Sequence, residues 1–188
     1  MFLKRSGSVK EIILNKIKEA IIKSNKEDVY AVSLYLEYFC DNLYEPNVIL
    51  SYNTNEHLKE VMKDDVDELE AKWNYAYWLQ EELYVFGTGD TKDVVKEWFI
   101  KNNYGYLTAN EYFSSDISDE LISEIDMKIR EELIEVVKEL HNSNFIKEQF
   151  CKEIPVLIHE LEYYDEILEI NKKSNPEYLL EGFKKFFE

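Results

Sequence analysis

The side chains best suited to chemistry lie together near the C-terminal end of the chain. They are one imidazole and three carboxylates, from His159, Glu160, Glu162 and Asp165. Imidazole nitrogens and carboxylate oxygens are ligands of zinc and of harder divalent cations. The cluster lacks the second histidine of the His-Glu-x-x-His pattern of zinc proteases. A carboxylate-dependent, metal-binding hydrolase is therefore the alternative hypothesis for this chain and not the leading one.

No other pattern predicts catalytic residues or a cofactor. The chain has no Gly-x-Ser-x-Gly elbow, and Gly87-Thr88-Gly89 is not followed by the Gly-Lys-Ser/Thr of a phosphate-binding loop. Cys40 and Cys151 are far apart in the sequence, and unpaired cysteines are usually buried. We expect both to be reduced core residues, which is typical of a cytoplasmic protein.

An acidic segment followed by aromatic residues is the best candidate for a binding site. Residues 64–70 contain five carboxylates, and an aromatic segment follows them. Carboxylates steer basic partners toward a surface, and tryptophan and tyrosine anchor interfaces. The residues of this predicted site are Asp64, Asp65, Asp67, Glu68, Trp73, Tyr75 and Trp78. The competing interpretation is that the aromatic rings fill the protein core.

The net charge of −17 is unevenly distributed along the chain. Residues 1–26 carry seven basic and two acidic side chains, whereas the remaining 162 residues carry 15 basic and 37 acidic ones, a net charge of −22. Such a chain repels nucleic acid and anionic lipid and attracts basic proteins. Charge of this size also keeps a protein soluble without any partner. The charge predicts a basic protein as partner, and neither nucleic acid nor a membrane.

The N-terminal segment does not resemble a signal peptide. It is basic, but it continues as an amphipathic helix pattern and not as an apolar core segment. No apolar run approaches the roughly 20 residues that span a bilayer. We therefore expect a cytoplasmic protein.

The element that organises the predicted fold is a strand at 29–39. Its even positions, from Tyr30 to Tyr38, are large and apolar and are expected to share one buried face. The seven-residue turn at 41–47 leads to a second strand at 48–53, and its length fits an antiparallel hairpin. The spacing of apolar residues does not decide whether Trp73–Trp78 is strand or helix, and it favours a helix from Trp78 onward.

Helical patterns fill most of the remaining chain. They are predicted at 9–24, 54–62, 91–101, 117–141, 145–151, 163–173 and from Pro176 onward, with a last strand at 156–158. Ser8 is expected to cap the first helix with Glu11, and Ser115 or Asp116 to cap the helix at 117–141. This order of elements predicts a single α+β domain over residues 1–188, with a small, mostly antiparallel sheet packed against several helices.

Four segments occur in an order that is similar to an uncharacterised bacterial family. They are Tyr-Ala-Val-Ser-Leu-Tyr at 30–35, Asn-Thr-Asn-Glu-His-Leu at 53–58, Lys-Trp-Asn-Tyr-Ala-Tyr-Trp at 72–78, and Leu161-Glu162 leading to Ser174-Asn175-Pro176. Over residues 10–185 the chain resembles the bacterial domain of unknown function 4303, a family that brings no activity or catalytic residues. Small acidic α+β proteins of this kind also resemble immunity proteins, which neutralise bacterial toxins. The leading hypothesis is an acidic binding protein that masks a basic toxin.

Overall fold

The computed structural model of the protein describes residues 8–24 and 27–188. At its centre is a four-stranded sheet in the order β3-β2-β1-β4. β1 (Val29–Tyr38) is antiparallel to β2 (Pro46–Thr54), which is antiparallel to the short β3 (Tyr84–Phe86), a strand that the sequence analysis does not predict. β4 (Val156–His159) is parallel to β1, because the long helical connection between them can return to the starting end of the sheet. The predicted α+β fold is confirmed.

β1 is buried on both faces, and each face belongs to a different hydrophobic core. Val32 and Leu34 point into the first core, as the even-numbered pattern predicts. The pattern also places Tyr30 there, but the structure packs it into the second core together with Ala31. The reason is a register shift between Val29 and Ala31 in the pairing with β2, which reverses the alternation. The prediction for Tyr30 is therefore wrong, and Val29 lies in the first core.

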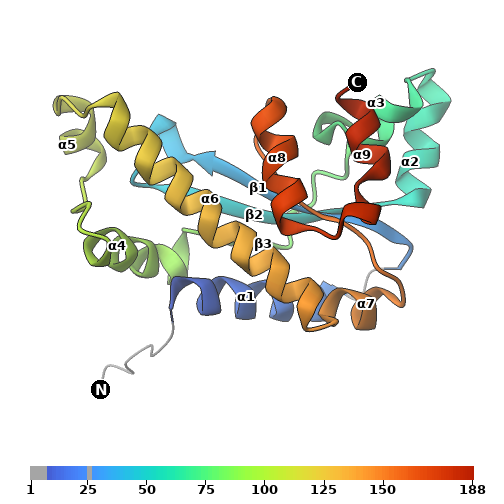
Figure 1. Ribbon diagram of the computed structural model, residues 1–188, viewed down its shortest axis with the longest axis horizontal. Helices are drawn as coiled ribbons and strands as arrows, with labels where there is room; N and C mark the ends of the chain where they lie inside the picture. Colours follow the sequence, from blue (N-terminus) through green and yellow to red (C-terminus); the bar gives the residue numbers. More distant parts are fainter. Residues whose placement is uncertain (1–7, 25–26) are drawn as a thin grey trace.

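Four helices cover the first face of the sheet: α1 (Val9–Ser24), α4 (Lys92–Lys101), α6 (Asp119–Asn142) and α7 (Phe145–Phe150). α6 crosses the strands diagonally and presents a buried apolar residue every three or four positions from Ile125 to Leu140 (Figure 1). α1 begins with the predicted capping box: the Ser8 N–H donates to Glu11 Oε2 at 2.8 Å, and the Glu11 N–H donates to Ser8 Oγ at 3.2 Å. No helix in the described part of the chain has the length and apolarity to cross a membrane.

The predicted start of α6 is wrong by a few residues. Ser118 is the cap, because its Oγ accepts the Leu121 N–H at 3.3 Å, whereas Ser115 and Asp116 precede the helix. The reason is a separate helix, α5 (Ala109–Ser114), which the sequence analysis does not predict and which ends at an extended Ser115. Residues 115–118 connect α5 to α6, so α6 begins later than predicted.

The helices over the second face gather at one end of the molecule. α2 (Asn55–Val61), α3 (Glu68–Trp73) and α9 (Glu181–Phe186) lie opposite the end that holds α4 and α5 (Figure 1). α3 and α9 pack closely, since a Cβ on Gly182 would lie 2.8 Å from the Trp73 ring. Trp73 ends α3, and the 3-10 turn η3 (Tyr75–Tyr77) follows. Neither a third strand over Trp73–Trp78 nor a helix from Trp78 onward forms.

The outer edge of β4 is paired with asparagine side chains from α8 (Asp165–Ser174) and the residue after it. Asn175 Oδ1 accepts the Val156 N–H at 2.8 Å, and its Nδ2 donates to the Val156 carbonyl oxygen at 2.9 Å. Asn171, one helical turn earlier, makes the same pair of bonds to Ile158. A sheet edge with free backbone groups is a template for aggregation, and these side chains close it.

The prediction that both cysteines are core residues is wrong. Cys40 and Cys151 are exposed and free. Cys40 lies within the 3-10 turn η1 (Phe39–Asp41) and Cys151 directly follows α7, and both have left-handed backbone, with φ angles of 51° and 55°. Both residues therefore lie where the chain reverses at the surface. The remaining 3-10 turns are η2 (Met62–Asp64), η4 (Gly89–Thr91) and η5 (Glu177–Leu179).

Candidate protein-binding side

The second face of the sheet brings several polar side chains together. Three neighbouring rows across β4, β1 and β2 contain Leu157, Ser33 and Ser51, then His159, Tyr35 and Ile49, and then Glu37 and Asn47. The rows follow from the alternation of side chains along each strand, which points every second residue to the same face. The strands therefore place a serine, a histidine, a tyrosine and a carboxylate next to one another.

Ser33 and His159 form a buried hydrogen bond between adjacent strands. Ser33 Oγ lies 2.7 Å from His159 Nε2, and His159 Nδ1 lies 3.1 Å from the backbone oxygen of Glu160. Burial lowers the pKa of His159 to about 4, so the imidazole is neutral at pH 7. A serine paired with an oriented histidine is the arrangement of many hydrolases, but both side chains are fully buried. In this conformation the pair joins β1 to β4 and has no access to a substrate.

Aromatic rings surround His159 and include part of the predicted binding site. Ring centroids lie 4.7 Å away for Tyr75, 5.4 Å for Tyr163, 5.6 Å for Tyr35 and 6.4 Å for Trp78. Trp73, Tyr75 and Trp78 are 4%, 8% and 2% exposed, because α3 and η3 fold them down onto the sheet. The aromatic half of the predicted binding site thus fills the second core, as the competing interpretation states.

The acidic half of the predicted binding site lies at the surface. Asp67 caps α3, since its Oδ1 accepts the N–H groups of Leu69 and Glu70 at 2.9 and 3.2 Å. Asp64, Asp65 and Glu68 are exposed, and none of them forms an ion pair with another described residue. Asp67 is therefore held by the fold, whereas the other three carboxylates face solvent.

The predicted metal ligands do not converge. His159 is buried beneath aromatic rings, and Glu160 pairs with Arg130. Glu162 and Asp165 are exposed beyond the end of β4. Among the residues that the structure describes, no three His, Cys, Asp or Glu side chains are placed to hold a metal ion. The reason is that β4 points His159 into the second core while the chain turns Glu160 toward α6. This geometry does not support the metal-binding alternative.

Glu160 belongs to a half-buried network at the carboxyl ends of β1 and β4. Arg130 on α6 pairs with Glu160, and its Nε donates to Asp126 Oδ2 at 2.7 Å. The Tyr38 hydroxyl donates to Asp126, and the Tyr164 hydroxyl donates to Glu160 at 3.4 Å. Burial raises the pKa of Glu160, and the Arg130 guanidinium opposes that rise. The network ties α6 to the strand ends and engages Arg130 with two carboxylates.

The acidic segments at 64–68 and 162–166 lie on the same side of the molecule. α2, α3, α8 and α9 are above the strands in Figure 1, whereas the lysine-rich α1 is below them. We use the term acidic side for the exposed carboxylates of these two segments, which form no ion pair with other described residues: Asp64, Asp65, Glu68, Glu162, Asp165 and Glu166.

Large apolar side chains are exposed within and beside the same two segments. Leu161 and Tyr164 are 73% and 44% exposed, and Met62, two residues before Asp64, is 41% exposed. Tyr77 is 37% exposed, and its backbone oxygen lies 3.0 Å from a ring nitrogen of His57 on α2. Aromatic residues and methionine are enriched at the centre of protein interfaces. The acidic side therefore combines charge with apolar contact residues.

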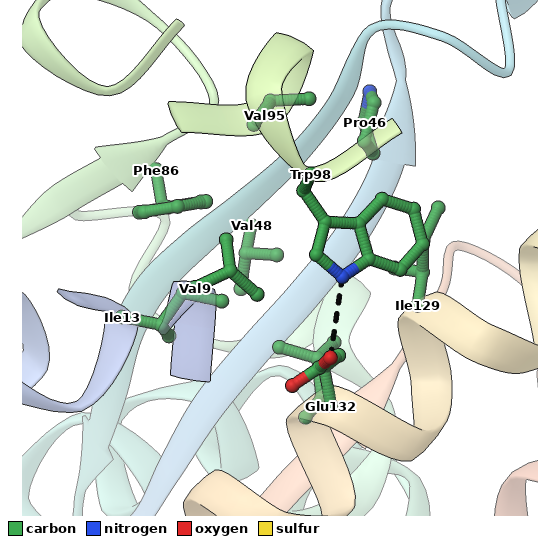
Figure 2. Close-up of a pocket in the computed structure, with 10 residues that line it drawn as sticks. Val9, Ile13, Pro46, Val48, Phe86, Val95, Trp98, Ile129 and Glu132 are labelled. Carbon is green, nitrogen blue, oxygen red and sulfur yellow. Dashed lines mark hydrogen bonds between the residues drawn. The ribbon is translucent and has the colours of Figure 1, made fainter. Parts of the chain in front are cut away.

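An apolar pocket lies between α1, α4 and α6 on the first face of the sheet (Figure 2). Trp98 Nε1 donates to Glu132 Oε1 at 3.2 Å at its rim, and Val48 and Val95 form part of its wall. Its free volume is about 30 Å³, which is far below the roughly 300–1,000 Å³ of small-molecule sites. The pocket is a packing gap and not a ligand site.

Three residues of this side, Ser33, Tyr35 and Arg130, are not predicted from the sequence. A signal for the first two is present, because they occupy the odd positions of β1, which line the second face. Arg130 follows Asp126 by four residues on a helix, a spacing at which opposite charges meet. Its pairing with Glu160 has no comparable signal, since the two residues are 30 positions apart.

Comparison with protein-family models, with curated proteins and with solved structures finds no match to this chain. The resemblance to the bacterial domain of unknown function 4303 therefore stays a prediction.

Proposed function

We propose that this protein is an acidic binding protein whose partner is a basic protein. The observation that carries the proposal is the acidic side, where exposed carboxylates alternate with exposed Leu161 and Tyr164, and where Met62 lies two residues before Asp64. Carboxylates attract and orient a basic surface, and desolvated apolar residues supply the contact area that holds it. The net charge of −17 supports a partner of the opposite, positive charge.

Solubility alone accounts for the charge but not for the apolar residues. A surface that only has to remain in solution favours charged side chains and few exposed large apolar ones. Leu161 is 73% exposed and is followed directly by Glu162. Their combination supports a surface that is covered in a complex.

The finer proposal is an immunity-type role, in which the basic partner is a toxin that this protein masks. It draws support from the likeness of small acidic α+β proteins to immunity proteins. Its test is co-expression with a basic toxin encoded beside this chain, where the expected result is protection of the cell. If the protein does not protect the cell against such a toxin, the immunity role is wrong. Binding to a basic partner is tested separately.

Binding is tested with a labelled octa-arginine peptide, measured by fluorescence anisotropy between about 50 and 300 mM NaCl. One variant neutralises the acidic side: Asp64→Asn, Asp65→Asn, Asp165→Asn, Glu68→Gln, Glu162→Gln and Glu166→Gln. A matched control neutralises the same number and type of exposed residues elsewhere: Asp93→Asn, Asp116→Asn, Asp119→Asn, Glu97→Gln, Glu120→Gln and Glu148→Gln.

We expect the acidic-side variant to lose about tenfold or more in affinity and the control about threefold or less, because both change the net charge equally but only one removes the contact site. Affinity of the unsubstituted protein must also fall as salt is added. Equal losses in the two variants, or binding that does not respond to salt, contradict the proposal.

A further inference from the structure

Two tyrosines stack on the second face of the sheet, beside the acidic side. The ring centroids of Tyr35 and Tyr75 are 5.2 Å apart, and the ring planes differ by 22°. Tyr35 is half-buried on β1, and its hydroxyl makes no hydrogen bond with another described residue. Glu37 follows on the same face of β1, and the exposed Glu82 precedes β3. We use the term tyrosine–carboxylate face for Tyr35, Tyr75, Glu37 and Glu82.

Glu37 lies close enough to act on both phenols, and Glu82 acts on that of Tyr75. Burial is the main reason that the pKa of Tyr35 is raised, and the charges of Glu37 and Glu160 add to the rise. Burial likewise raises the pKa of Tyr75, with contributions from Glu82 and Glu37. A carboxylate that disfavours a second negative charge nearby favours a positive one for the same reason.

Glu37 and Glu82 carry the uncompensated charge of the face. The only hydrogen bond of the Glu37 side chain within the described residues is a long one from Asn47 Nδ2, at 3.4 Å. Neither Glu37 nor Glu82 forms an ion pair in the part of the chain that the structure describes. Arg130 is already paired with Asp126 and Glu160. Within residues 8–24 and 27–188, no cation therefore pairs with either carboxylate of this face.

Building on the proposed function, we infer that the tyrosine–carboxylate face receives an arginine side chain of the basic partner. A guanidinium is planar, so it stacks on a tyrosine ring while its N–H groups bind a carboxylate through two parallel hydrogen bonds. Tyr35 offers the ring and Glu37 the carboxylate on one strand face. A lysine ammonium is a strongly hydrated point charge. It stacks less well on a tyrosine ring, and it does not bind a carboxylate through two parallel hydrogen bonds.

The test compares octa-arginine with octa-lysine on the unsubstituted protein, on Glu37→Gln, and on Glu97→Gln as a control for an exposed carboxylate on α4. We expect octa-arginine to bind about two- to fivefold more tightly than octa-lysine, and Glu37→Gln to remove that preference. Glu97→Gln is expected to retain it. If Glu37→Gln and Glu97→Gln behave alike while octa-arginine still binds in a salt-dependent manner, the inference is wrong and the proposed function stands.

A second readout does not depend on peptide affinity. N-acetyl-arginine amide is titrated against the protein, and the ring proton resonances of Tyr35 and Tyr75 are followed by NMR. We expect shifts with this probe that exceed those with N-acetyl-lysine amide and that vanish in Glu37→Gln. Equal shifts with the two probes, or shifts that are unchanged in Glu37→Gln, overturn the arginine site. This outcome can be read even if the octa-arginine peptide does not bind and the proposed function has failed.

Discussion

Asn171 pairs with Ile158 through both groups of its side-chain amide. Its Nδ2 donates to the Ile158 carbonyl oxygen at 2.7 Å, and its Oδ1 accepts the Ile158 N–H at 2.9 Å. The side chain is fully buried, so water does not compete for these bonds. One residue of α8 thus takes the place of a neighbouring strand and fixes β4 in the sheet. Since β4 carries His159, this contact also positions the polar residues of the second face.

Replacing Asn171 with leucine is expected to lower the free energy of unfolding by about 2–5 kcal/mol, because each buried backbone group left without a partner costs about 1–3 kcal/mol. Urea unfolding followed by circular dichroism measures the loss. Lys172→Leu, at the exposed next position, is the control and is expected to change stability by less than about 0.5 kcal/mol. A loss below about 1 kcal/mol for Asn171→Leu would show that water replaces the amide.

Acid is expected to destabilise the protein through His159. Its pKa is about 4 in the folded protein against 6.5 in the unfolded chain, so the unfolded chain takes up a proton first as the pH falls. The stabilisation is complete above pH 6.5 and is lost between pH 6.5 and 4, to a total of about 3 kcal/mol.

The measurement is the slope of the unfolding free energy against pH in the unsubstituted protein and in His159→Gln. The variant is expected to lose most of this slope, whatever its stability at pH 7. Burial also lowers the pKa of His141, and this contribution remains in both proteins. Parallel pH profiles would assign the acid sensitivity to other groups.

Arg130→Met is expected to destabilise the protein by about 2 kcal/mol at pH 7, because Asp126 and Glu160 remain as half-buried carboxylates without a cation. The loss is expected to shrink in acid, since the raised pKa of Glu160 rises further without the guanidinium and the carboxyl becomes neutral. Lys138→Met removes an exposed pair with Glu135 and is expected to cost less than about 0.5 kcal/mol. Thermal unfolding of both variants at pH 7 and pH 4.5 measures these stability losses. A loss for Arg130→Met that is larger at pH 4.5 than at pH 7 contradicts this account.

Val48→Ile is expected to raise the free energy of unfolding by about 0.5–1 kcal/mol. The added methylene enters the gap of about 30 Å³ between α1, α4 and α6, and a buried methylene contributes about 0.8 kcal/mol (Figure 2). Val32→Ile is the matched control, because Val32 is 1% exposed and does not line the gap. We expect that variant to lose about 1 kcal/mol through overpacking. Equal responses at the two positions, measured by urea unfolding, would mean that the gap closes in solution.

Local patterns in the sequence determine most of the helices and the hairpin. The apolar spacing from Ile125 to Leu140 and the capping box of Ser8 with Glu11 depend on residues within a few positions of one another, so they can be recognised without the rest of the chain. The net charge and the exposure of Asp64 and Asp65 follow in the same way from composition. The pairing of β1 with β2 follows from a short connection between two apolar strands.

The tertiary structure alone decides which face each side chain meets. A one-residue register shift moves Tyr30 from the first core to the second, and the packing of α3 against α9 buries Trp73 in place of exposing it. The Ser33–His159 hydrogen bond joins residues 126 positions apart, and no local pattern contains both. Local sequence sets the conformation of each segment because its interactions are between near neighbours, whereas burial, pairing and the candidate binding side arise only from contacts between distant segments.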